Sequence, residues 1–69
     1  MKYAILIESG PRNYSAFAPD LPGCVAVGYT LDEVKENMRS AIASHIENLR
    51  SHGDPVPPPT LDISYAEIA

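Results

Sequence analysis

The 69-residue sequence contains a single cysteine, Cys24, and only two histidines, His45 and His52. One cysteine excludes an internal disulfide. So few sulfur and imidazole ligands also fall short of the patterns that bind zinc. We therefore expect neither a metal nor another cofactor. No apolar run approaches the ~20 residues of a membrane span, so no membrane partner is expected either.

Basic residues are scarce as well. Five lysines and arginines stand against nine aspartates and glutamates, which gives a net charge of −4. Nucleic-acid binding relies on clustered lysine and arginine to displace counterions, so we expect no direct DNA binding by this chain. An acidic surface would suit a basic partner, although the same mild acidity also serves simply to keep a small protein soluble.

The short length predicts one domain, residues 1–69, of marginal stability. A chain of this size buries only about 60% of its unfolded surface. Without disulfides or metals, self-association is the remaining source of stability, so we expect a homo-oligomer, either a dimer or a tetramer. The start Met1-Lys2-Tyr3 enters a strand pattern directly, without the layout of a signal peptide. We therefore expect a cytoplasmic protein.

Three strands are predicted in the first half of the chain, over Met1–Glu8, Tyr14–Ala18 and Cys24–Tyr29. Apolar residues line both faces of the first, which is typical of a central strand. The third strand carries small residues on one face, and such a face lets another element approach closely. Glycine, proline and asparagine between the first two strands indicate a hairpin.

The turn between the second and third strands has a specific composition. Pro19 lacks a donor for the ladder and ends the second strand. Pro22 fixes φ early in the turn, and Gly23 supplies the positive φ that such a turn usually needs. We expect the Asp20 side chain to cap this turn.

A single amphipathic helix is predicted from Leu31 to about His52. Thr30 is its N-cap, and Glu33 three residues later completes a capping box. Gly53 and the proline at position 55 end it. Apolar residues recur at helical spacing, at Leu31, Val34, Met38, Ala41, Ile42, Ile46 and Leu49.

The segment 54–59 contains four prolines and predicts a stiff extended connector, with a Pro-x-x-Pro peptide ligand as the alternative. Alternation over Leu61–Ile68 predicts a fourth strand. A right-handed crossover would place it parallel to the first strand, giving an α+β fold of strand order 3-2-1-4. One helix cannot cover both faces of four strands, so another subunit or a partner should seal the uncovered apolar face or an edge strand.

The run Pro19-Asp20-Leu21-Pro22-Gly23-Cys24, a short apolar strand, Gly28-x-Thr30, an acidic amphipathic helix and the proline-rich segment after it together resemble the HicB-like antitoxins. Tyr29 departs from the pattern, where an acidic or small polar residue is more usual. The resemblance implies a partial ribonuclease-H-like fold. The residues that form this structural motif are Tyr14, Phe17, Pro19, Pro22, Gly23, Cys24, Thr30 and Gly53.

The resemblance also implies a function and a partner. Family members are antitoxins of type II toxin–antitoxin systems. They bind a small basic HicA-like toxin, which is similar to a double-stranded-RNA-binding domain and cuts mRNA, and they neutralise it by occlusion. Many carry a second, DNA-binding domain. This sequence stops soon after the expected fourth strand, so we expect a neutralising module only. The expected partner surface joins the loop to the first helical turn, at Asp20, Leu21, Asp32, Glu33 and Glu36.

Two alternatives to the antitoxin come from other functional classes. The chain could be an orphan homo-oligomeric interaction or ligand-binding module without a toxin. It could also be an enzyme, since a ribonuclease-H-like shape suggests two-metal hydrolysis by converging carboxylates. The spacing of the candidates Glu8, Asp20, Glu33 and Glu36 gives no sign of convergence. Cys24 lacks a base nearby in sequence, so we expect a buried structural thiol, no catalytic residue and no enzymatic activity.

Overall fold

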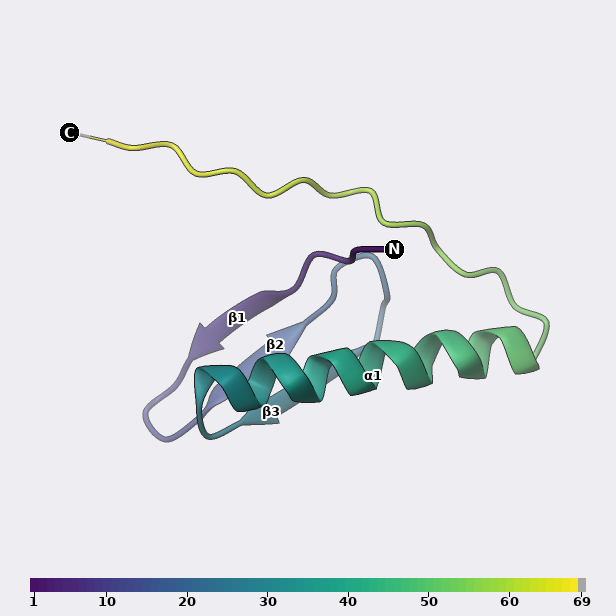
Figure 1. The fold of residues 1–69 in the computed structure, drawn as a ribbon, viewed down its shortest axis with the longest axis horizontal. Coiled ribbons are helices and arrows are strands. Elements are labelled where there is room, and N and C mark those ends of the chain that lie inside the picture. Colours follow the sequence, from purple (N-terminus) through teal and green to yellow (C-terminus); the bar gives the residue numbers. More distant parts are fainter. Residues whose placement is uncertain (69) are drawn as a thin grey trace.

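The structure is a computed structural model that describes residues 1–68. In this part of the chain it contains strands β1 (Leu6–Ser9), β2 (Tyr14–Phe17) and β3 (Val25–Gly28), followed by helix α1 (Leu31–Ser51). The strands form an antiparallel sheet in the order β1-β2-β3. Figure 1 shows α1 lying along one face of this sheet. The predicted α+β class, the three-stranded meander and the single helix are confirmed.

The strand register divides the sheet into two chemically different faces. Leu6 lies opposite Phe17, which lies opposite Val25, and these three form one row. Because side chains alternate along a strand, the next row falls on the other face, where Ala16 lies opposite Ala26. The row of Ala16 and Ala26 toward the helix is therefore small, although Ile7 and Tyr14 share that face, and larger apolar residues line the face away from the helix.

Gly28 brings the helix and the sheet into close contact. A Cβ atom at this position would lie 2.6 Å from the backbone nitrogen of Val34 and 2.9 Å from its Cα. No side chain fits in that space, which explains why β3 presents small residues to the helix. A hydrogen bond of 2.7 Å from the Asn37 side chain to the Val27 carbonyl fastens α1 to β3 in the same region.

The local signals at both ends of the helix are confirmed. The Thr30 hydroxyl accepts a hydrogen bond from the Glu33 amide at 3.0 Å, and the Glu33 carboxylate accepts one from the Tyr29 amide at 3.0 Å. The Glu33 carboxylate thus bonds the amide of the residue before the N-cap and not the amide of the N-cap itself. Gly53, with φ of +70°, follows the C-cap His52, and Gly23 has the positive φ predicted for the turn.

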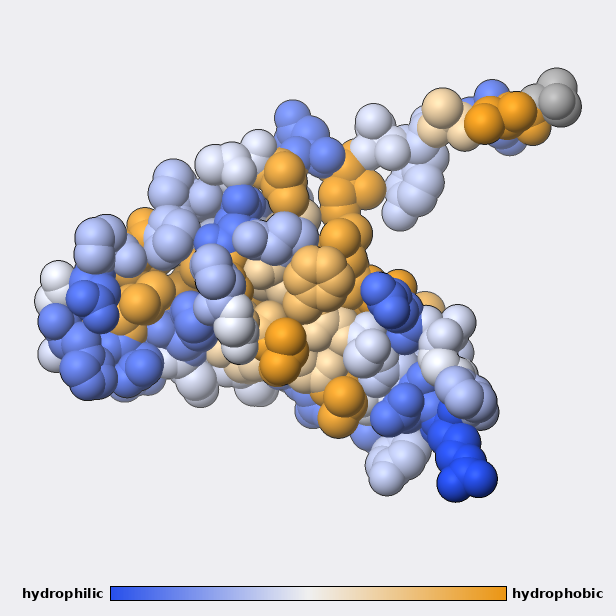
Figure 2. Space-filling model, turned by 180° about the vertical axis from the view of Figure 1, so that it is seen from behind, coloured by the Kyte–Doolittle hydropathy of each residue, from blue (hydrophilic) through white to orange (hydrophobic). Residues whose placement is uncertain are grey.

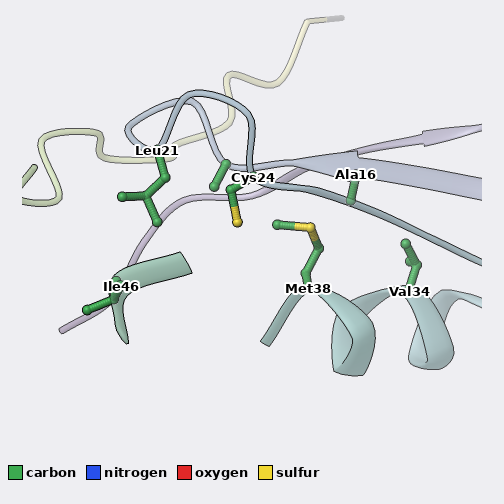
Figure 3. Packing of buried hydrophobic residues seen from close by; sticks show 7 residues of the cluster. Ala16, Leu21, Cys24, Val34, Met38 and Ile46 are labelled. Carbon is green, nitrogen blue, oxygen red and sulfur yellow. The ribbon is translucent and has the colours of Figure 1, made fainter. Parts of the chain in front are cut away.

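The core lies between α1 and the small-residue face of β2 and β3. Its buried residues are Ala16, Ala18, Leu21, Cys24, Val34, Met38 and Ile46. Figure 3 shows Leu21 and Cys24 pointing from the sheet side toward Met38 and Ile46 of the helix. Leu21, Val34 and Met38 are fully enclosed. The segment between β2 and β3 therefore supplies three of these buried residues, Ala18, Leu21 and Cys24, whereas the strands supply only Ala16.

The predicted fourth strand is not formed. Residues 61–68 adopt no regular structure, and Figure 1 shows them leading away from the body of the molecule. A strand requires backbone hydrogen bonds to a neighbour, and in residues 1–68 none joins this segment to β1. The order 3-2-1-4 is therefore not realised, and β1 is an edge strand instead of a central one. The helix packs over β2 and β3 but not over β1.

Candidate partner-binding site

The acidic residues predicted to form one partner surface lie in two separate places. Asp20 belongs to the loop that joins β2 to β3, whereas Asp32, Glu33 and Glu36 lie in the first turns of α1. The loop precedes β3 and the helix follows it, so the two groups stand at opposite ends of that strand (Figure 1). The structure does not bring them together.

Leu21 is not available to a partner. Its side chain has 0% exposure because it points into the core against the helix (Figure 3). From the sequence alone, a leucine between an aspartate and a proline is expected to be an exposed loop residue. Only the folding of the loop back over the helix makes it a core residue.

Asp20 holds the segment that follows the helix, instead of capping its own turn as predicted. Its carboxylate accepts hydrogen bonds from the Thr60 hydroxyl at 2.6 Å and from the Thr60 amide at 2.9 Å. The Tyr3 hydroxyl donates to the Pro57 carbonyl at 2.6 Å nearby. Hydrogen bonds stabilise the charged carboxylate, so the Thr60 hydroxyl and then its amide lower the pKa of Asp20 below its usual value.

This contact predicts that the attachment of residues 57–60 depends on pH. A carboxyl whose pKa is lowered by folding stabilises the folded arrangement above its ordinary pKa of 3.8, and this contribution is lost as pH falls through the lower, folded value. We expect the Thr60 amide to lose protection from hydrogen exchange as the solution is acidified below that range. Asp20→Asn should show weak protection at every pH, because the neutral amide accepts less strongly. Equal protection in both proteins at neutral pH would contradict the assignment.

The first helical turns keep an acidic surface of their own. Asp32, Glu33 and Glu36 are all exposed. Glu33 is engaged in the helix cap, and Glu36 lies 3.7 Å from Arg39 in an exposed ion pair of the kind that contributes little to stability. Asp32 and Glu36 therefore present negative charge to the solvent beside the end of β3.

The largest feature beside this acidic turn is the uncovered face of the sheet. Figure 2 shows hydrophobic side chains gathered over the middle of the face that the helix does not cover. The exposed residues of this apolar face are Leu6, Phe17, Val25, Val27 and Tyr29. Val25, which ends the row on the edge strand β3, is 65% exposed, and Phe17 in the middle of that row is 38% exposed. Contiguous apolar surface of this kind commonly marks a protein–protein interface.

An uncovered apolar face was expected from the sequence, but its residues were not named as a site. Alternation of large apolar residues in β2 and β3 was the signal that could have identified them. The predicted site consisted mainly of acidic residues instead. A cluster of charged residues can be recognised in a sequence, whereas the face of a sheet that no helix covers cannot.

The comparisons with known proteins show the family of this chain. Residues 3–67 match the family described as HicB-like antitoxins of bacterial toxin–antitoxin systems. The chain belongs to this family. It is also similar to one chain of the solved HicA3 and HicB3 toxin–antitoxin complex, with a TM-score of 0.75 and 36% identity over 84% of this chain and 69% of that one.

Curated relatives of this HicB-like chain come from a phage and from archaea. It is 39% identical over 83% of its length to an uncharacterised 14.9 kDa protein of Haemophilus phage HP1, of which it covers 43%. It is 36% identical over 83% of its length to a UPF0150 protein of Thermoplasma acidophilum, of which it covers 84%. The chain therefore spans less than half of the phage relative and most of the archaeal one.

The structure also places the residues considered for catalysis. Cys24 is buried, and burial raises the pKa of its thiol, which is the opposite of what a nucleophile requires. Glu8 lies in β1, opposite Ser15 of β2. In residues 1–68, no three histidine, cysteine, aspartate or glutamate side chains are close enough to share a metal ion.

No helix in that range is long and apolar enough to cross a membrane.

Proposed function

We propose that this protein is the antitoxin of a type II toxin–antitoxin system and neutralises a small basic HicA-like toxin by binding and covering it. Membership of the HicB-like family is the observation that carries the proposal, and the similarity to a chain of a toxin–antitoxin complex supports it. Inhibition by occlusion requires an extended complementary surface and no catalytic group, so the proposed role is not enzymatic.

The apolar face of the sheet, with the acidic first turns of α1 beside it, is the surface proposed to receive the toxin. A protein that binds RNA must carry basic residues. Asp32 and Glu36 would attract such a surface and speed the encounter. The apolar residues around Val25 would then lose contact with water, and burial of apolar area at about 25 cal/mol per Å² supplies the lasting affinity.

A lysine on the apolar face should separate binding from folding. Val25→Lys places a cation within the proposed interface, but in the free protein its side chain can remain in water because Val25 is largely exposed. We expect the inhibition constant toward the toxin to rise at least tenfold, on the order of 1.4 kcal/mol. The measurement is cleavage of an RNA substrate by the product of the adjacent reading frame, titrated with wild-type or variant protein.

Ser40→Lys is the matched control, because it adds the same charge at an exposed position of α1 on the side away from the sheet. It should inhibit like the wild type. Undiminished RNA cleavage in the presence of excess wild-type protein would refute the antitoxin role and favour an orphan interaction module. Full inhibition by Val25→Lys would retain the role but place the interface elsewhere.

A further inference from the structure

The basic residues of this acidic protein are not evenly spread. Three of its five lysines and arginines, Lys2, Lys35 and Arg39, line one groove. The groove lies between the residues that lead into β1 and the helix, and Tyr3, Ile5 and Ile42 are among the residues that line it. It exists because α1 covers β2 and β3 and leaves β1 uncovered. An apolar floor with a positively charged rim fits an extended segment that is both apolar and acidic.

Residues 61–68 have this chemistry. Their sequence, Leu-Asp-Ile-Ser-Tyr-Ala-Glu-Ile, contains two carboxylates and no cation. In an extended chain Leu61, Ile63, Tyr65 and Glu67 share one face. That face would bring three apolar side chains and one negative charge to the same surface. The apolar residues of the segment are exposed, Leu61 and Ile63 to 49% and 53%, and Tyr65 and Ile68 to 93% and 91%.

The anchors of this segment keep it out of the groove of its own chain. Thr60 is held by Asp20, and Pro57 by Tyr3. A second hollow lies between residues 2–4 and residues 59–63, so residues 2–4 stand between the departing segment and the groove beside α1. Residues 61–68 would have to cross over the start of the chain, at Lys2 and Tyr3, to enter it. Figure 1 shows them continuing away from the body instead.

We propose that residues 61–68 of one copy bind in the groove between residues 1–5 and α1 of a second copy, and that the exchange is reciprocal within a two-fold dimer. Such a contact is isologous, so each chain donates one segment and accepts one. Eight extended residues span about 26 Å, which is enough to follow the start of the chain from residue 2 into β1. Dimerisation would cover Leu61, Ile63 and Tyr65 and bring Glu67 against the rim, and Asp62 on the opposite face would add to the negative charge of the segment. This inference does not depend on the antitoxin role.

A charge exchange between two variants tests the proposal. Lys35→Glu with Arg39→Glu makes the rim acidic, and Asp62→Lys with Glu67→Lys makes the segment basic. Each double variant alone would then repel itself at both contacts. We expect sedimentation equilibrium to show a wild-type dimer and a dimer dissociation constant at least about tenfold larger for either variant alone. In an equimolar mixture both contacts are complementary again, so a heterodimer of near wild-type affinity should form.

The control Arg12→Glu with Arg50→Glu changes the net charge as much as the rim variant does, but at exposed residues that do not line the groove. It should leave the dimer unchanged, and circular dichroism should confirm that all variants are folded. A monomeric wild type at micromolar concentration would overturn the proposal. So would dimers that persist in both variants, or variants that dissociate alone and are not rescued by mixing, because the segment would then occupy its own chain or the interface would lie elsewhere.

Discussion

Replacement of Met38 by alanine should destabilise the protein by about 2–5 kcal/mol, as removal of a fully buried methionine does in other proteins. Met38 has 0% exposure and points from the middle of α1 toward Cys24 and the sheet (Figure 3). The neighbours that would have to close the cavity are fixed. Ala16 and Cys24 are small residues on strand and loop backbone, so they cannot extend into the space that the methionine leaves.

The size of the chain makes this loss severe. Domains of this length are only marginally stable, so a few kcal/mol is a large fraction of the total. We therefore expect Met38→Ala to be substantially unfolded in the absence of a partner. Urea unfolding at one fixed protein concentration, followed by far-ultraviolet circular dichroism, measures the effect, since stability depends on concentration if copies associate. Met38→Leu keeps most of the volume and should cost less than about 1.5 kcal/mol. Equal stability of the alanine and leucine variants would show that Met38 is not enclosed.

Gly28→Ala should be nearly as damaging, although it adds only one methyl group. The added carbon would meet the backbone of Val34, and backbone in the first turn of a capped helix cannot rotate aside as a side chain can. The helix would have to move away from β3, and such overpacking typically costs about 1–3 kcal/mol. Movement of α1 would also loosen the contact between Val34 and the core, and thermal unfolding measures the combined loss.

Gly23→Ala provides the contrast for this prediction. At Gly23 a Cβ atom meets nothing within 4 Å, but φ is +84°, so the cost is conformational strain of about 1–2 kcal/mol. Asn at position 23 tolerates the left-handed region and should recover part of the loss, whereas Asn at position 28 should be at least as harmful as alanine. A Gly28→Ala protein that unfolds at the wild-type temperature would contradict the close approach of helix and strand.

Local signals in the sequence decided the helix, its two ends and the turn before β3, whereas the first strand begins at Leu6 and not at Met1 as expected. Thr30 and Glu33 fix the start of the helix, Gly23 fixes the turn, and the apolar stripe that includes Val34 and Met38 identifies the buried face of α1. Each of these signals acts over a few residues, through one hydrogen bond, one dihedral angle or one repeat. Side-chain alternation in β2 and β3 likewise follows from the sequence.

Long-range contacts could not be predicted in the same way. Asp20 and Thr60 are 40 residues apart, and their pairing depends on where the chain runs after the helix. Leu21 becomes a core residue only because its loop folds over α1. Residues 61–68 are the clearest example of a structure that depends on long-range contacts. Their alternation is compatible with a strand, but a strand exists only where another backbone supplies hydrogen bonds.

The sequence alone thus determined the helix, the three-stranded meander and the family, because caps, turn residues and alternation act between near neighbours. Only the tertiary structure decided which face of the sheet the helix covers, where the basic groove lies and what Asp20 holds. Those features depend on distances between segments that are far apart in the chain, and no local preference encodes such distances.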